Sequence, residues 1–87
     1  MSGRNKVVAE LMRGLRHERD ELNLQMHLAG KEVQDQWNQL NDRFIQLNDD
    51  YEPLKDAVKE TSDDVWDSLK LVGEELREGF HRIRQSL

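Results

Sequence analysis

Apolar residues recur along the chain at steps of three or four positions, from Val8 to Leu87. This spacing places them on one face of an α-helix, whereas a β-strand would show alternation of apolar and polar residues. We call the following positions the apolar stripe: Val8, Leu11, Leu15, Glu18, Leu22, Met26, Ala29, Val33, Trp37, Leu40, Phe44, Leu47, Tyr51, Leu54, Val58, Ser62, Val65, Leu69, Val72, Leu76, Phe80, Ile83 and Leu87. Among them only Glu18 and Ser62 are polar. The mean step of about 3.6 residues predicts nearly straight amphipathic helices along the whole chain.

A helix with one apolar face needs other helices to cover that face. Two facing helices make only a thin core, whereas four enclose one. We therefore expect an all-α fold in which residues 1–87 form a single domain, a long antiparallel helical hairpin that dimerises into a four-helix bundle or coiled coil. The alternative is a monomeric three-helix bundle with a turn near Gly30, because glycine is common where helices end. Ala29 and Val33 nevertheless keep the phase of the stripe across that glycine.

Two segments compete for the turn of the hairpin. In the first, 49–53, Asp49 or Asp50 is suited to cap a new helix, and Pro53 then falls in its first turn, where the missing N–H costs little. In the middle of a helix the same proline would cost about 3 kcal/mol. A turn here predicts one helix over about 5–48 and a second that runs to about residue 86.

The second segment, 60–63, holds Thr61 and Ser62, which are favourable N-cap residues. Asp63 and Asp64 follow, and their carboxylates suit the positive end of a helix dipole. The stripe is also interrupted here, at Ser62. The chain turns or kinks at one of the two segments, at both, or at neither. In the last case it forms one bent helix that pairs with a second chain.

The residues after this second segment resemble a motif of small bacterial helical proteins of unknown function. In that motif a serine or glycine and two acidic residues precede Ala-Trp-x-x-Leu-Lys. The matching residues here are Ser62, Asp63, Val65, Trp66, Leu69 and Lys70. The resemblance implies a long charged coiled-coil helix, a turn at 61–63 and a second amphipathic helix, and it implies no catalytic residue. Pro53 and the basic start of the chain depart from the pattern.

The net charge of −5 is unevenly distributed along the chain. Residues 1–19 hold five basic and two acidic residues, residues 20–78 hold six basic and sixteen acidic ones, and residues 79–87 hold two basic ones. An acidic total argues against general nucleic-acid binding, which requires a basic surface. The absence of cysteine excludes disulfides and fits a cytoplasmic protein. The longest apolar run has three residues, so we expect no transmembrane segment.

Motifs of catalytic, cofactor and metal sites are missing from the sequence. There is no glycine-rich phosphate loop, no nucleophile elbow and no pair of carboxylates suited to a cleft. Glu78 and His81 have the Glu-x-x-His spacing of di-iron bundles, but the pattern occurs once and Glu78 faces away from the stripe. We therefore expect a non-enzymatic protein with no cofactor and no metal site.

The best functional candidate is segment 4–19, which reads as a basic amphipathic helix. Such helices bind acidic partner helices or anionic membrane surfaces. In the simpler interpretation its arginines only meet the acidic middle of a neighbouring helix. We expect a structural or interaction module that acts through helical self-association, as a homodimer or higher oligomer, or through binding of a partner helix. The alternative is a peripheral binder of anionic membrane or lipid surfaces.

The candidate interaction residues come from this segment and from the aromatic positions. Trp66 lies one position off the stripe, which predicts packing at the edge of the bundle or contact with a partner chain. The full set is Arg4, Lys6, Val8, Leu11, Arg13, Leu15, Arg16, Trp37, Phe44, Trp66 and Phe80.

Overall fold

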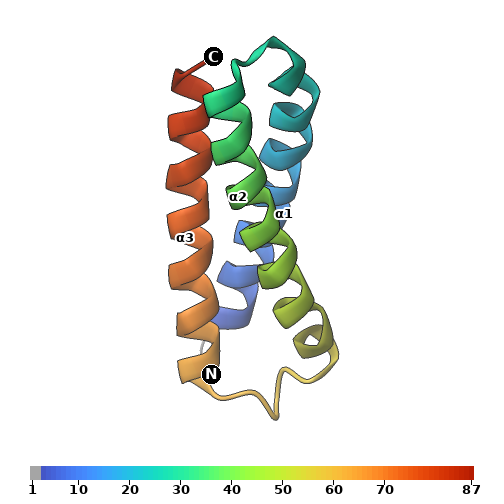
Figure 1. Ribbon diagram of the computed structural model, residues 1–87. Helices are drawn as coiled ribbons and strands as arrows, with labels where there is room; N and C mark the ends of the chain where they lie inside the picture. Colours follow the sequence, from blue (N-terminus) through green and yellow to red (C-terminus); the bar gives the residue numbers. More distant parts are fainter. Residues whose placement is uncertain (1–2) are drawn as a thin grey trace.

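Three α-helices joined by two connections make up the fold in the computed structural model, which describes residues 3–87 (Figure 1). Helix α1 spans Arg4–Gln25, α2 spans Lys31–Tyr51 and α3 spans Asp63–Gln85. The first and third helices run in the same direction and α2 runs against both (Figure 1). The bundle measures 45 × 19 × 17 Å. The all-α class expected from the stripe is confirmed, because the described residues contain no strand.

The first connection reverses the chain at 26–30. After α1 a short 3₁₀ segment covers Met26–Leu28, and Ala29 and Gly30 are extended, with ψ angles of 150° and 166°. The side-chain amide of Gln34 donates hydrogen bonds to the carbonyl oxygens of Met26 and Ala29, both at 3.1 Å, and so closes the turn. The uninterrupted helix expected over 5–48 is therefore wrong, and the break falls where the three-helix alternative placed it.

The second connection uses both of the segments that competed for a turn. Helix α2 ends at Tyr51, Pro53 stands at the start of a 3₁₀ segment over Glu52–Asp56, and Ser62 is the N-cap of α3. The hydroxyl of Thr61 donates a hydrogen bond of 2.6 Å to the carbonyl oxygen of Ala57. One segment therefore ends a helix and the other begins the next. A single bent helix is wrong.

The two aspartates of the first segment do not cap a helix. Asp49 and Asp50 lie in the last turn of α2, two residues and one residue before its end at Tyr51. The expectation that one of them starts a new helix is therefore wrong. The new helix starts at Asp63 instead, where Asp63 and Asp64 occupy the first turn as expected.

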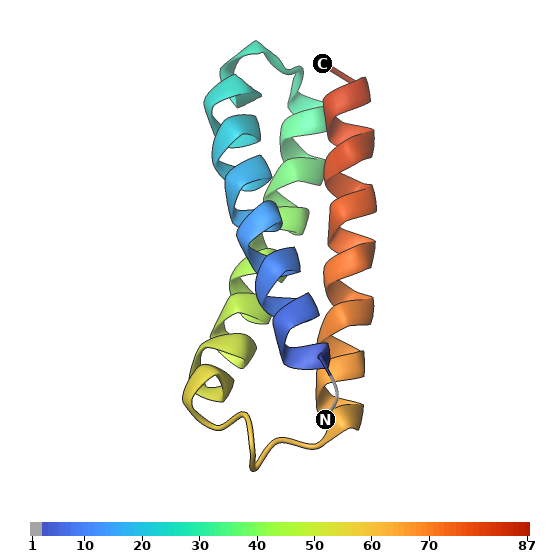
Figure 2. The same cartoon turned by 180° about the vertical axis from the view of Figure 1, so that it is seen from behind.

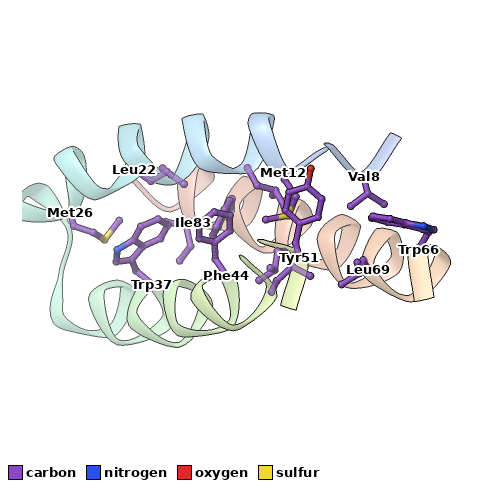
Figure 3. Packing of buried hydrophobic residues seen from close by; sticks show 14 residues of the cluster. Val8, Met12, Leu22, Met26, Trp37, Phe44, Tyr51, Trp66, Leu69 and Ile83 are labelled. Carbon is purple, nitrogen blue, oxygen red and sulfur yellow. The ribbon is translucent and has the colours of Figure 1, made fainter. Parts of the chain in front are cut away.

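The core runs the length of the bundle between all three helices (Figure 3). Phe80 lies near its centre, with its ring centroid 5.3 Å from that of Trp37 and 6.4 Å from that of Phe44. The buried hydrophobic residues are Val8, Met12, Leu15, Leu22, Met26, Trp37, Phe44, Leu47, Tyr51, Trp66, Leu69, Leu76, Phe80 and Ile83. All of them except Met12 and Trp66 belong to the apolar stripe. One chain thus covers its own stripe, and dimerisation stays a prediction.

Two glycines of α3 allow its neighbours to approach closely. A Cβ atom added at Gly73 would lie 2.5 Å from Cδ2 of Leu11 on α1. A Cβ atom added at Gly79 would lie 2.7 Å from Cδ2 of Leu40 on α2. Both glycines are buried, so α3 contacts each neighbouring helix at a position without a side chain. Figure 2 shows α1 lying against α3 at the end where both helices begin.

Replacement of Pro53 by alanine tests the position of this proline. Pro53 is exposed and stands at the start of a 3₁₀ segment, where its missing N–H interrupts no helical hydrogen bond. The free energy of unfolding should fall by about 0.4–1 kcal/mol in Pro53→Ala, because alanine gives the unfolded chain more freedom. Urea denaturation of the two proteins measures this change. A gain in stability would instead place a strained proline inside a helix.

Candidate binding groove between α1 and α3

Most of the apolar candidate interaction residues lie inside the core of the single chain. Their exposed fractions range from 0 to 4%, and they are Val8, Leu15, Trp37, Phe44, Trp66 and Phe80. Contact between these side chains and a partner stays a prediction, and it would require the bundle to open. Leu11 differs from them, because it is only partly buried and borders a surface groove.

The basic candidates divide into two pairs. Arg4 forms ion pairs with Asp63 at 2.7 Å and Asp67 at 2.9 Å, which join the start of α1 to the first two turns of α3. Arg16 donates a hydrogen bond of 3.0 Å to Asn48 and lies 3.7 Å from a carboxylate oxygen of Glu52. These arginines therefore meet the acidic part of their own chain.

The other pair, Lys6 and Arg13, stays on the surface. Both side chains are exposed, and neither forms an ion pair with any of the residues from 3 to 87. Two positive charges on the outside of α1 are thus available to another molecule. They lie seven residues apart, about two helical turns or roughly 10 Å along α1, so they do not form a compact patch.

A groove of about 380 Å³ runs between α1 and α3, and we call it the α1–α3 groove. From α1 it is bordered by Val7, Leu11, Leu15, Gly14, Glu10 and Glu18, and from α3 by Lys70, Glu74 and Arg77. Its floor is apolar, because Leu11 and Leu15 belong to the stripe and Val7 is 46% exposed beside them. Its rim carries three acidic and two basic side chains. The groove therefore combines an apolar floor with a charged rim.

Glu18 has an unusual environment in this groove. Its Oε2 atom is buried and has no hydrogen-bond partner, the one such side-chain nitrogen or oxygen found within residues 3–87. Arg77 borders the same groove but forms no ion pair with Glu18. Buried polar atoms in proteins are almost always hydrogen-bonded, because an unmet one costs about 1–3 kcal/mol. This carboxylate oxygen is therefore an acceptor that lacks a donor among the described residues.

Gly14 leaves one wall of the groove as bare backbone. It is exposed in the middle of α1, and a Cβ atom added there would meet no other atom within 4 Å. No packing contact with the described residues therefore requires a glycine at this position. Another molecule that enters the groove can approach the backbone of α1 here more closely than at any residue with a side chain.

Gly14→Ala should raise the free energy of unfolding by about 0.5–1 kcal/mol, because alanine favours a helix over glycine by that amount. Thermal and urea denaturation measure the gain. Gly73→Ala is the matched comparison, since its new Cβ would press on Leu11 and offset the same gain. An equal or larger gain at Gly73 would contradict the close contact of α1 and α3.

Comparison of the chain with protein-family models, with curated proteins and with solved structures finds no match. The resemblance of the segment from Ser62 to Lys70 to a bacterial motif therefore stays a prediction. In the structure Ser62 is the N-cap of α3, and Trp66 packs edge-on against Tyr51 with the ring centroids 6.5 Å apart. The start of α3 thus accounts for the position of Ser62, and packing in the core accounts for that of Trp66.

The α1–α3 groove was not predicted from the sequence. The feature that could have indicated it is Glu18, a polar residue in the apolar stripe between Leu15 and Leu22, which are both fully buried. The interruption at Ser62 marks the start of a helix, whereas the one at Glu18 marks a charged group at the edge of the core.

No helix among the described residues is long and apolar enough to cross a membrane.

Proposed function

We propose that this protein is a non-enzymatic interaction module that binds an amphipathic helix of a partner protein in the α1–α3 groove. The observation that carries this proposal is the buried, unpartnered Oε2 atom of Glu18 beside an apolar floor. A partner that supplies a hydrogen-bond donor gains a charge-assisted hydrogen bond once the Glu18 carboxylate turns this atom toward the groove. The same partner removes the apolar floor from water.

The dimensions of the groove fit a short helix. Its α1 side extends from Val7 to Glu18, about 16 Å at 1.5 Å per residue, or three helical turns. A partner helix of about twelve residues would place apolar side chains at steps of three and four over Leu11 and Leu15, as helices that bind in grooves do. The bare backbone at Gly14 allows it to approach closely.

The charges of the rim indicate which residue the partner carries. Glu10, Glu18 and Glu74 outnumber Lys70 and Arg77 by one. The Oε2 atom of Glu18 accepts a hydrogen bond and donates none when the carboxylate is ionised. An arginine or lysine near one end of the partner helix therefore suits the groove, and arginine suits it better because its planar guanidinium matches a carboxylate.

Self-association is one version of this proposal. A second copy of the chain offers Arg13 and Lys6 as exposed basic side chains on α1. The reason for expecting a dimer was the need to cover the apolar stripe, and the three helices of one chain already bury most of it. Binding to a membrane through the stripe would require the bundle to open, and no observation on the described residues favours that.

The proposal can be tested with synthetic helical peptides. We would titrate ¹⁵N-labelled protein with a set of stapled twelve-residue helices that carry leucines at steps of three and four and one arginine at varied positions. Shifts of the amide signals of Val7, Gly14 and Glu18 are expected. Gly14→Leu should abolish them by filling the groove, whereas Leu71→Ala, on the exposed side of α3, should not.

Two outcomes would contradict the proposal. One is that no peptide of the set produces saturable shifts. The other is that the shifts lie outside the groove or persist in Gly14→Leu. Size-exclusion chromatography with light scattering at several protein concentrations shows whether a second copy occupies the groove. In that case the dimer should also be lost in Gly14→Leu.

A further inference from the structure

A second cavity lies at the end of the bundle where α1 and α3 begin, and we call it the end pocket. It has a volume of about 600 Å³ and shares no bordering residue with the α1–α3 groove. The start of α1, the last residues of the second connection and the start of α3 surround it. The residues that decide its chemistry are Lys6, Val58, Lys59, Asp63 and Trp66.

Trp66 contributes a hydrogen-bond donor to the end pocket. The side chain is only 3% exposed, yet its Nε1–H group has no acceptor among the described residues. Figure 3 shows that this nitrogen lies on the outer edge of the ring, away from the labelled core residues and toward the end of the bundle. This N–H group is not itself buried, because the Oε2 atom of Glu18 is the one buried side-chain nitrogen or oxygen without a partner among residues 3–87. The pocket is therefore bordered by a donor that meets solvent and has no acceptor among the described residues.

The charged groups of the pocket favour an anion. Lys6 and Lys59 are exposed on its walls, and neither forms an ion pair with another described residue. Among the described residues that border the pocket, Asp63 is the one with a carboxylate, and Arg4 compensates its charge at 2.7 Å. Two ammonium groups and one indole N–H thus face the same space.

The apolar groups of the pocket require a ligand with an apolar part. Val58 is 37% exposed at its wall, and the ring of Trp66 borders it from the core side. An inorganic ion would leave this surface wet. A carboxylate, with one charge and two acceptor oxygens, matches one N–H group and two lysines.

We propose that the end pocket binds a carboxylate attached to a short apolar group. The Nε1–H group of Trp66 donates to one carboxylate oxygen, Lys6 and Lys59 supply the positive charge, and Val58 contacts the apolar part. A free carboxylic acid and the C-terminal carboxylate of a peptide with an apolar last residue share this chemistry. The pocket is separate from the α1–α3 groove, so this proposal does not depend on the function proposed above.

The indole signals of the two tryptophans provide a direct test. Trp66→Phe identifies the signal of Trp66 in a ¹H–¹⁵N spectrum, and Trp37 serves as the internal reference because it lies in the core away from the end pocket. The probes are hexanoate, 1-hexanol, inorganic phosphate, and acetyl-Ala-Leu as the free acid and as the amide. We expect a saturable downfield shift of the Trp66 signal with hexanoate, with the peptide acid or with both, and no shift of the Trp37 signal.

Variants of the lysines test the assigned roles. Lys6→Gln and Lys59→Gln should each weaken binding of the carboxylate about fivefold or more, because each removes a charge-assisted contact. Lys55→Gln is the matched control, since Lys55 lies in the same connection but pairs with Glu52 outside the pocket. A hexanoate response without a peptide response identifies a free acid as the ligand, and the reverse identifies a C-terminus.

Four results would overturn the proposal. The first is that the Trp66 signal shifts as much with 1-hexanol or with the peptide amide as with the acids. The second is that phosphate binds more tightly than every carboxylate. The third is that no probe produces a saturable shift. The fourth is that Lys55→Gln weakens binding as much as the two pocket variants do.

Discussion

Phe80→Ala should lower the free energy of unfolding by about 3–5 kcal/mol, the range for deletion of a buried phenylalanine side chain. Phe80 is fully buried on α3, and its ring lies against Trp37 and Phe44 of α2. The substitution leaves a cavity where two helices meet and also removes the aromatic contacts. Domains of this size are stable by about 4–13 kcal/mol, so the loss is a large part of the total.

Urea denaturation followed by circular dichroism measures the loss, and the fluorescence of Trp37 reports the local effect. Its emission should shift to longer wavelength as the ring beside it is removed. Leu71→Ala is the matched control on the same helix, because Leu71 is 62% exposed and its removal should change stability by less than about 0.5 kcal/mol. Equal losses in the two variants would contradict the placement of Phe80 at the centre of the core.

The composition of the core could be predicted from the sequence, whereas the path of the chain could not. Steps of three and four select residues that face the same side, and twelve of the fourteen buried hydrophobic residues satisfy this rule. The same spacing is found whether a helix continues or the chain reverses, so it does not predict where the turns fall. Ala29 and Val33 stay in phase across the turn because both still pack against the same core after the chain reverses.

The turn at 26–30 is difficult to identify from the sequence for a physical reason. Gly30 is the N-cap of α2 and has no side chain with which to cap it. The contact that closes the turn comes instead from Gln34, one turn into α2, and a glutamine at that place is common in any exposed helix. The second connection was easier to identify, because Pro53 and Ser62 stand at its two ends.

The candidate site illustrates a similar limit. The basic residues of segment 4–19 were candidates for contact with a partner, and in the simpler interpretation they meet the acidic middle of a neighbouring helix. Arg4 and Arg16 bind carboxylate and amide groups of their own chain. Lys6 and Arg13 form no ion pair among the described residues but are exposed, whereas the buried oxygen without a partner there belongs to Glu18, on the apolar side of the same helix. The charged residue within the apolar stripe therefore indicated the candidate site better than the basic residues around the stripe did. Only the structure shows that Glu18 borders a groove, whereas Ser62, the other polar residue of the stripe, begins a helix.

Glu18→Leu should raise the free energy of unfolding by about 1–2 kcal/mol and at the same time weaken binding of the arginine-bearing helix. Leucine removes a buried oxygen without a donor and continues the apolar stripe between Leu15 and Leu22. The partner loses its carboxylate acceptor, so affinity should fall by about tenfold or more. A residue that lowers stability but supports binding is what a binding site is expected to contain.

The decisive measurement compares peptides that differ in one group. A helix with arginine and the same helix with citrulline, its neutral analogue, should bind the unmodified protein with different affinities and the Glu18→Leu variant with equal ones. Glu10→Leu is the control on the exposed rim of the same groove, and it should keep most of the difference. If Arg77 held Glu18 in solution, both Glu18→Leu and Arg77→Ala would lower the melting temperature. That result would contradict an unpartnered carboxylate and with it the proposed role of the groove.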